Sequence, residues 1–149
     1  MNFTPSETLK KPEPQTKTPT ARDLMTKKLI SFQPDDDVYM AIDALLKNRI
    51  SGAPVIDKGR LAGVLSENDC LKVLAHKSFE QMPRAKVRDY MSPGQDCRTI
   101  GPDTDIFKIA DIFLREKFRR LPVVDDGIVV GQVSRKDVLQ YIHYVHHKR

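Results

Sequence analysis

The chain contains the same stretch of sequence twice. Gly63–Leu71 reads GVLSENDCL and Gly131–Leu139 reads GQVSRKDVL, so that a glycine, a serine, an aspartate and a leucine recur at an offset of 68 residues. When Pro34–Leu74 is aligned with Pro102–Ile142 at that offset, thirteen of forty-one positions are identical. A duplication of this length is typical of two copies of one supersecondary unit, neither of which buries its apolar faces alone.

Each copy predicts the same order of elements: a helical turn, a short strand, an amphipathic helix, two apolar strands joined by a turn, and a closing helix. The first copy places them at Ala21–Met25, Leu29–Phe32, the apolar stripe Val38, Ala41, Ile42, Leu45 and Leu46, Ala53–Ile56, Leu61–Leu65, and from Ser66 onward. The second copy places them at Val87–Met91, Cys97–Ile100, the stripe Ile106, Ile109, Ala110, Phe113 and Leu114, Leu121–Val124, Ile128–Val133, and from Ser134 onward.

The expected fold class is therefore α/β (α+β), with two tandem β-α-β-β-α motifs packed face to face about a pseudo-two-fold axis. The expected boundaries are a flexible tail at 1–19, a first motif at 20–75, a linker at 76–86, a second motif at 87–145 and a C-terminal tail at 146–149. The tail at 1–19 is rich in Pro, Thr and Lys, a composition that cannot bury enough apolar surface to order itself.

Composition narrows the class of protein. A chain of 149 residues that is 40% hydrophobic is long enough to bury a core. It has no apolar run of membrane-spanning length, and its N-terminus lacks the apolar segment of a secretory signal. Two cysteines, Cys70 and Cys97, provide no disulfide framework. We therefore expect a cytoplasmic protein that does not contact a membrane.

The repeated Ser-x-x-Asp sequence has two interpretations. Ser66 and Asp69, like Ser134 and Asp137, have the spacing of a helix-capping box. The same hydroxyl and carboxylate could also accept hydrogen bonds from two ribose hydroxyls beside a helix N-terminus that favours phosphate. The spacing alone does not choose between a cap and a nucleotide site.

The two copies resemble the CBS motif, and residues 20–142 as a whole resemble a tandem CBS pair, also called a Bateman module. The resemblance is carried by Arg22–Met25, Arg88–Met91, Ser51–Asp57, Arg120–Asp125, Gly63–Asp69 and Gly131–Asp137, in this order. It implies a regulatory module that binds adenosine-containing nucleotides in two clefts between the motifs. In that family the Asp of Ser-x-x-Asp holds the ribose hydroxyls. Residues of the opposite motif, at the start of its long helix and before its Pro-Val strand, complete the site.

By this resemblance, the first cleft combines residues from both copies: Val64, Ser66, Asp69, Thr104, Phe118, Arg119 and Arg120. Phe118 would offer a face to the base and the two arginines would bind phosphate. Phe118 could equally be a core residue, and the arginines could be part of a solvated basic patch.

The second cleft would combine Ser134 and Asp137 with Asp36, Ile50, Ser51 and Gly52. It departs from the family pattern, since Gln132 replaces an apolar residue against the base and Asp36 replaces Thr104. Asp36 would repel phosphate there, or it could simply belong to an acidic helix start. Phosphorylated ligands are therefore expected in the first cleft before the second.

The predicted ligand is AMP, ADP, ATP or S-adenosylmethionine, with no prosthetic group, no metal and no catalytic residue. His143, His146 and His147 have helical spacing but no Cys or acidic residue is paired with them. We therefore interpret them as surface residues and not as a metal site. A homodimer is expected from Val138, Leu139, Tyr141, Ile142 and Val145. The alternative function is a protein- or RNA-binding scaffold, supported by a net charge of +5. Nucleic acid is not the expected partner, since the sequence has no interleaved aromatic platform.

Overall fold

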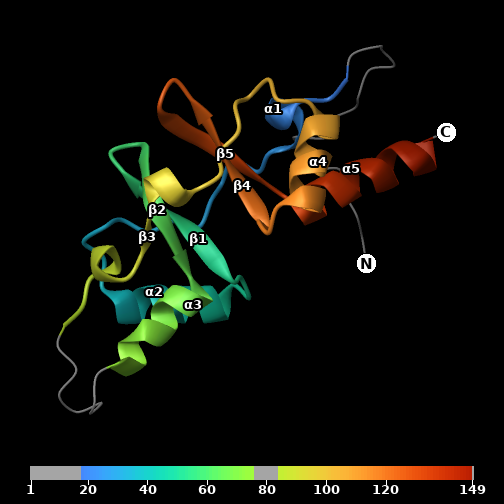
Figure 1. Ribbon diagram of the computed structural model, residues 1–149. Helices are drawn as coiled ribbons and strands as arrows, with labels where there is room; N and C mark the ends of the chain where they lie inside the picture. The colour runs from blue at the N-terminus through green and yellow to red at the C-terminus, as the bar shows by residue number, and fades with distance from the viewer. Residues whose placement is uncertain (1–17, 76–83, 149) are drawn as a thin grey trace. The chain divides into compact units, whose positions relative to one another are not determined.

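The computed structural model describes residues 18–75 and 84–148 of the chain (Figure 1). They form two compact units, which are described separately below. The first-repeat unit is Ile30–Cys97, and the second-repeat unit combines residues 18–29 with residues 98–148. Most of the predicted tail at 1–19 and of the predicted linker at 76–86 lies outside the described residues.

The first-repeat unit is built on a three-stranded antiparallel sheet in the order β1-β2-β3. Helices α2 and α3 lie side by side in this unit (Figure 1). Its elements in chain order are α2 (Val38–Lys47), β1 (Gly52–Asp57), β2 (Arg60–Ser66), α3 (Glu67–Leu71), η2 (Lys72–Ala75), η4 (Val87–Asp89), β3 (Ser92–Pro93) and η5 (Gly94–Asp96). The β1–β2 turn places Lys58 and Gly59 at positive φ, which explains why a glycine stands there.

The second-repeat unit has a two-stranded antiparallel sheet, β4-β5, with α4 and α5 side by side (Figure 1). Its elements are α1 (Ala21–Leu24), α4 (Ile106–Arg115), β4 (Arg120–Asp125), β5 (Ile128–Ser134) and α5 (Arg135–Lys148). Helix α5 continues to Lys148, past the predicted motif boundary at residue 145. The predicted mixed fold class is confirmed, since each repeat contains an antiparallel strand hairpin followed directly by a helix.

The two repeats exchange their Arg-Asp-x-Met segments. Leu24 of the first repeat is buried in the core of the second-repeat unit, with Ile109 and Leu121. Val87 of the second repeat is buried in the core of the first-repeat unit, with Val55. Each compact unit is therefore completed by a segment of the other sequence repeat.

Two glycines make room for the exchanged segments. A Cβ on Gly131 would lie 2.6 Å from the sulfur of Met25 and 3.0 Å from the carbonyl oxygen of Thr26. A Cβ on Gly63 would collide with the carbonyl oxygen of Ser92 and lie 3.2 Å from the sulfur of Met91. The repeated glycine is thus required by a close backbone approach.

Two details differ from the sequence predictions. Leu46 and Leu114 were placed in the apolar stripes but are 69% and 85% exposed, because one helix face contacts the unit's core and they lie outside it. The predicted strands at 29–32 and 97–100 are single parallel bridges, from Phe32 to Val55 and from Ile100 to Val123. A turn follows each bridge and ends the extended segment. After Phe32, this turn is closed by a hydrogen bond from the amide of Asp36 to the carbonyl of Gln33.

Candidate functional site

Ser66 and Asp69 form a complete capping box at the end of β2. The amide of Asp69 donates to Ser66 Oγ at 3.1 Å, and the amide of Ser66 donates to Asp69 Oδ2 at 2.9 Å. The Ser66 hydroxyl donates to the same carboxylate oxygen at 3.0 Å. The capping interpretation is therefore correct, and it fixes the carboxylate in one orientation.

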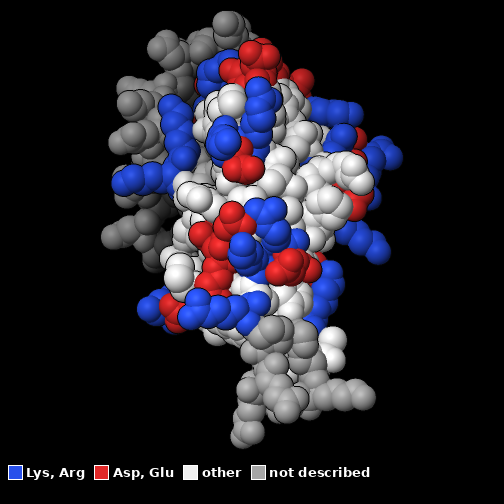
Figure 2. Space-filling view, turned by 90° about the vertical axis from the view of Figure 1, so that its left-hand side faces the viewer, with Lys and Arg blue, Asp and Glu red and all other residues white. Residues whose placement is uncertain are grey.

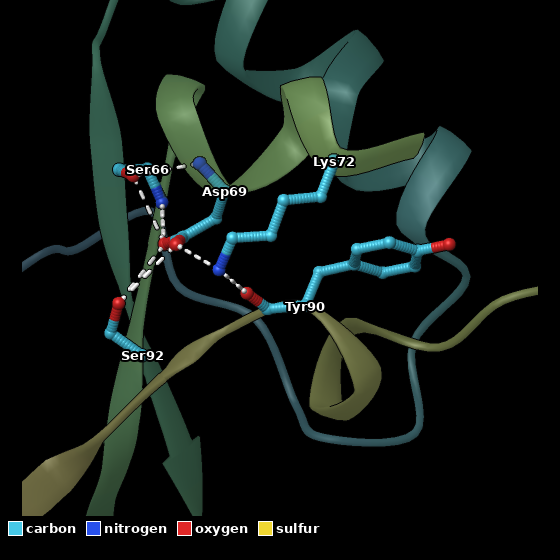
Figure 3. A network of polar contacts seen from close by, with 5 residues as sticks. All are labelled: Ser66, Asp69, Lys72, Tyr90 and Ser92. Carbon is cyan, nitrogen blue, oxygen red and sulfur yellow. Dashed lines mark hydrogen bonds and ion pairs between the residues drawn. The ribbon is translucent and has the colours of Figure 1, made fainter. Parts of the chain in front are cut away.

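The second oxygen of Asp69 is held by two further side chains, as Figure 3 shows. Lys72 Nζ lies 3.2 Å from Asp69 Oδ1, and the Ser92 hydroxyl donates to Oδ1 at 3.3 Å. Lys72 Nζ also lies 3.5 Å from the carbonyl oxygen of Tyr90. Asp69 is 5% exposed, whereas the side chain of Lys72 is 58% exposed. A buried carboxylate is thus covered by a cation that reaches it from solvent.

Ser134 and Asp137 repeat the capping arrangement in the second-repeat unit. Asp137 Oδ2 accepts from the Ser134 amide at 2.8 Å and from the Ser134 hydroxyl at 3.0 Å. Its other oxygen, Oδ1, accepts from the Thr26 hydroxyl at 3.2 Å. Burial raises the pKa of the Asp137 carboxyl above that of an ordinary aspartate, and the hydrogen bonds from Ser134 and Thr26 and the charge of Lys136 oppose that rise.

Gln132 and Val64 occupy equivalent positions on β5 and β2. The Oε1 atom of Gln132 is buried and has no hydrogen-bond partner among the described residues. The Gln132 backbone pairs with that of Thr26, whose hydroxyl reaches Asp137. Val64 is half-buried and apolar at the same place. An unsatisfied buried acceptor therefore lies in the second-repeat unit, two residues before Ser134 at the end of the strand.

Of the eight residues predicted to complete the two clefts, four belong to the first-repeat unit. Gly52 is the register partner of Ser66, and the Ser51 carbonyl accepts from the amide of Glu67 at 2.9 Å. Ile50 packs against the core. Asp36 Oδ2 accepts from the amide of Gln33 at 2.8 Å, as expected for an acid that stabilises a turn before a helix.

The other four belong to the second-repeat unit. Thr104 Oγ1 accepts from the amide of Gly101 at 3.1 Å. Phe118 packs partly buried against the core, Arg119 is exposed, and Arg120 is the register partner of Ser134. Within each unit, the residues before the Pro-Val strand are thus neighbours of that unit's own Ser-x-x-Asp sequence. The predicted cross-grouping of Thr104, Phe118, Arg119 and Arg120 with Asp69 joins two units and stays a prediction.

The hydroxyls of Thr26 and Ser92 and the ammonium group of Lys72 contact the two carboxylates but are not among the site residues predicted from the sequence. The offset of 66 that aligns Met25 with Met91 also aligns Thr26 with Ser92, so the sequence does show a hydroxyl residue at this place in both repeats. The contact of Lys72 had no repeated counterpart, because Gln140 occupies the equivalent position in the second repeat.

Within the described ranges, no group of three or more His, Cys, Asp or Glu side chains could hold a metal ion. The rings of His143 and His147 on α5 contact each other, with centroids 4.0 Å apart and ring planes tilted by 47°. No helix among the described residues has the length and apolar character needed to cross a bilayer.

Known proteins resemble the chain over most of its length. An uncharacterised protein of Methanocaldococcus jannaschii is 29% identical over 80% of this chain and 88% of its own length. Human 5'-AMP-activated protein kinase subunit gamma-3 is 33% identical over 76% of this chain, which spans 25% of that subunit. The solved structure of CBSX2 in complex with AMP has a TM-score of 0.71 and 32% identity, and covers 87% of this chain and 98% of its own.

The chain spans less than half of two other curated relatives, 42% of one and 14% of the other, so it corresponds to part of those longer proteins. The family model of the CBS domain matches residues 21–76 and 87–144, one match for each sequence repeat. These two matches cover more than half of the chain and coincide with the duplication. The chain therefore belongs to the CBS domain family and carries two CBS motifs.

Proposed function

We propose that the protein is a regulatory module that senses adenosine-containing nucleotides, of the AMP, ADP or ATP class, or S-adenosylmethionine. The observation that carries this proposal is the buried or half-buried aspartate at the end of the second hairpin strand of each unit, held in a fixed orientation by its serine. A carboxylate can accept from both hydroxyls of a ribose, and a preoriented one does so without losing rotamer freedom.

The relatives support the choice of ligand. CBSX2, at 32% identity, was solved with AMP, and the matching kinase subunit belongs to an AMP-activated enzyme by its name. We extend from them to this chain the binding of an adenine nucleotide. We also propose that Thr104, Phe118, Arg119 and Arg120 complete the Asp69 cleft, and that Asp36, Ile50, Ser51 and Gly52 complete the Asp137 cleft.

The module is regulatory rather than catalytic. The hydroxyls of Ser66 and Ser134 donate to carboxylates in capping boxes, so they are not placed as activated nucleophiles. Burial raises the pKa of the Cys70 and Cys97 thiols, which disfavours the reactive thiolate.

We further propose a cytoplasmic homodimer. On α5, Val138 is buried, but Leu139 and Ile142 are 63% and 54% exposed. A two-fold contact between copies is the commonest way to cover such apolar surface. Sedimentation at tens of micromolar should give about twice the chain mass of 17.0 kDa, and a monomer would contradict the dimer.

The alternative of an RNA-binding scaffold has less support. On the face shown in Figure 2, basic side chains lie next to acidic ones. Ion pairs on the surface, such as Lys47 with Asp43, also neutralise cations locally. RNA binding that depends steeply on salt, without any response to nucleotides, would favour the scaffold.

A thermal-shift panel tests the proposed function. AMP, ADP, ATP, S-adenosylmethionine and a non-adenosine nucleotide such as UMP are each added in excess. A ligand at about 100 times its Kd stabilises by roughly 2.7 kcal/mol, which shifts the Tm by several degrees. The variant with both Asp69→Asn and Asp137→Asn is the control and should not respond. If no adenosine compound raises the Tm of the wild-type protein, the proposal is wrong.

A further inference from the structure

The two aspartates differ in how much of their hydrogen-bonding capacity is already used. An ionised carboxylate accepts at about four positions, two on each oxygen. For Asp69, Oδ2 accepts from the amide and the hydroxyl of Ser66, and Oδ1 accepts from Lys72 and Ser92. The four positions are therefore filled by the protein's own donors (Figure 3).

Asp137 is not filled in the same way. Its Oδ2 accepts twice from Ser134, but its Oδ1 accepts once, from Thr26, within the described part of the chain. One acceptor position is therefore left on Asp137. Gln140 stands where the first repeat has Lys72, and no hydrogen bond joins it to Asp137 among the described residues.

We propose that Lys72 is a self-inhibiting cap on Asp69, which a nucleoside must displace before its ribose can bind. The proposal rests on the proposed function, because it concerns the same ribose-binding carboxylate. Lys72 is therefore a specificity-determining residue that makes the two sites unequal. A ribose without phosphate binds first at Asp137.

Displacement is physically accessible. The Lys72 side chain is more than half exposed and contacts the site through its terminal ammonium, so rotation of its flexible stem returns the charge to water. The two bonds from Ser66 belong to the capping box and would break only with the helix start. Lys72 is thus the donor that can most easily leave Asp69. The Ser92 hydroxyl, whose contact with Oδ1 is longer, is the second donor that a ribose could displace.

The ion pair also predicts an unusual salt dependence. Adenosine carries no charge, so salt has little direct effect on its contacts. Salt does weaken the attraction between the exposed ammonium of Lys72 and Asp69. Adenosine should therefore bind the Asp69 site more tightly as salt concentration rises, and the Asp137 site should not change.

The test measures adenosine binding by calorimetry to one site at a time. Asp137→Asn isolates the Asp69 site, and Lys72→Gln is then introduced into that background because glutamine is the residue of the second repeat. Loss of an ion pair of this exposure should tighten adenosine binding by roughly two- to fivefold. The salt dependence should disappear in the same variant.

Lys47→Gln is the matched control, because it removes one positive charge from an exposed pair with Asp43 on α2 of the same unit. It should leave the affinity for adenosine unchanged. The reciprocal change, Gln140→Lys in an Asp69→Asn background, should weaken adenosine binding at the Asp137 site.

The outcomes separate the two proposals. If wild-type protein binds adenosine but Lys72→Gln leaves the affinity of the Asp69 site unchanged or lowers it, the cap is wrong and the nucleotide-sensing function stands. If adenosine compounds bind neither the wild-type protein nor any variant, both the sensing function and the cap are rejected. Tighter binding in Lys72→Gln alone, with Lys47→Gln unchanged, supports both.

Discussion

Arg22 Nη1 lies 2.7 Å from Asp103 Oδ1, and this ion pair joins the Arg-Asp-x-Met segment of the first repeat to the helix start of the second. Arg88 and Asp35 make the equivalent ion pair in the first-repeat unit, where Arg88 Nε donates to Asp35 Oδ1 at 2.9 Å. Both pairs are exposed, so they contribute little stability themselves. They mark the exchange of segments, through which each repeat supplies part of the core of the other unit.

The exchange predicts where a core substitution in α1 acts. Leu24→Ala should cost about 2–5 kcal/mol, because Leu24 is buried among residues of the second-repeat unit. Hydrogen exchange should show the loss of protection in β4, β5 and α4, far along the chain from the substitution.

Val87→Ala is the counterpart, since Val87 is buried in the first-repeat unit. The loss of hydrogen-exchange protection in Val87→Ala should be smaller than in Leu24→Ala and should occur in β1, β2 and α2. If Leu24→Ala instead deprotects β1 and β2 first, the segment does not belong to the second-repeat unit.

The close approach at Gly131 predicts a second stability effect. Gly131→Ala places a methyl group 2.6 Å from the sulfur of Met25, so either Met25 or the backbone near Thr26 must move. Overpacking of this kind typically costs about 1–3 kcal/mol, measured by chemical denaturation.

Gly101→Ala provides the control, because the nearest atom to its Cβ would be Thr104 Oγ1 at 4.0 Å. That distance is ordinary van der Waals contact, so the change should be close to neutral. Equal costs at the two positions would argue against the packing explanation.

The raised pKa of Asp137 predicts that ribose binding at this site weakens on acidification. Protonation converts the carboxylate into a group with a donor and fewer acceptor positions, so it loses the acceptor position that a ribose hydroxyl would use. Adenosine affinity of the Asp69→Asn variant should fall as the pH is lowered toward the raised pKa of Asp137, at a higher pH than for an ordinary aspartate.

Protonation of Asp137 does not favour unfolding, so acid unfolding caused by this carboxyl would not explain a loss of adenosine affinity. A folded-state pKa above the unfolded value means that the folded protein takes up the proton more readily. The contribution of Asp137 to stability therefore rises as pH falls from its folded to its unfolded pKa. An affinity that stays constant with pH while the protein remains folded would contradict the prediction.

The sequence predicted the parts of the fold that local chemistry determines. The apolar strand pairs, their Asp- and Gly-containing turns and the Ser-x-x-Asp caps follow from short-range periodicity and turn preference. The segments at 29–32 and 97–100 were read as strands because they are apolar. They pair at one residue each, since the turns that follow them end the extended backbone.

The missed features depend on contacts between distant parts of the chain. Gly63 and Gly131 read as strand residues until the exchanged methionine segments are placed against them. Lys72 reads as one more surface lysine, because nothing in its neighbours indicates that its ammonium group reaches Asp69. The ligand-facing properties of the site therefore required the structure.

In the proposed function, Asp69 and Asp137 each bind one ribose of an adenosine ligand. The decisive experiment is a calorimetric titration of AMP into the wild-type protein, the single variants Asp69→Asn and Asp137→Asn, and the double variant. Asparagine keeps the shape of aspartate but replaces an acceptor with a donor, so binding at the altered site should weaken by at least about tenfold. Each single variant should lose one binding event, and the folded double variant should lose both. Wild-type affinity for AMP in the folded double variant would contradict the proposed function.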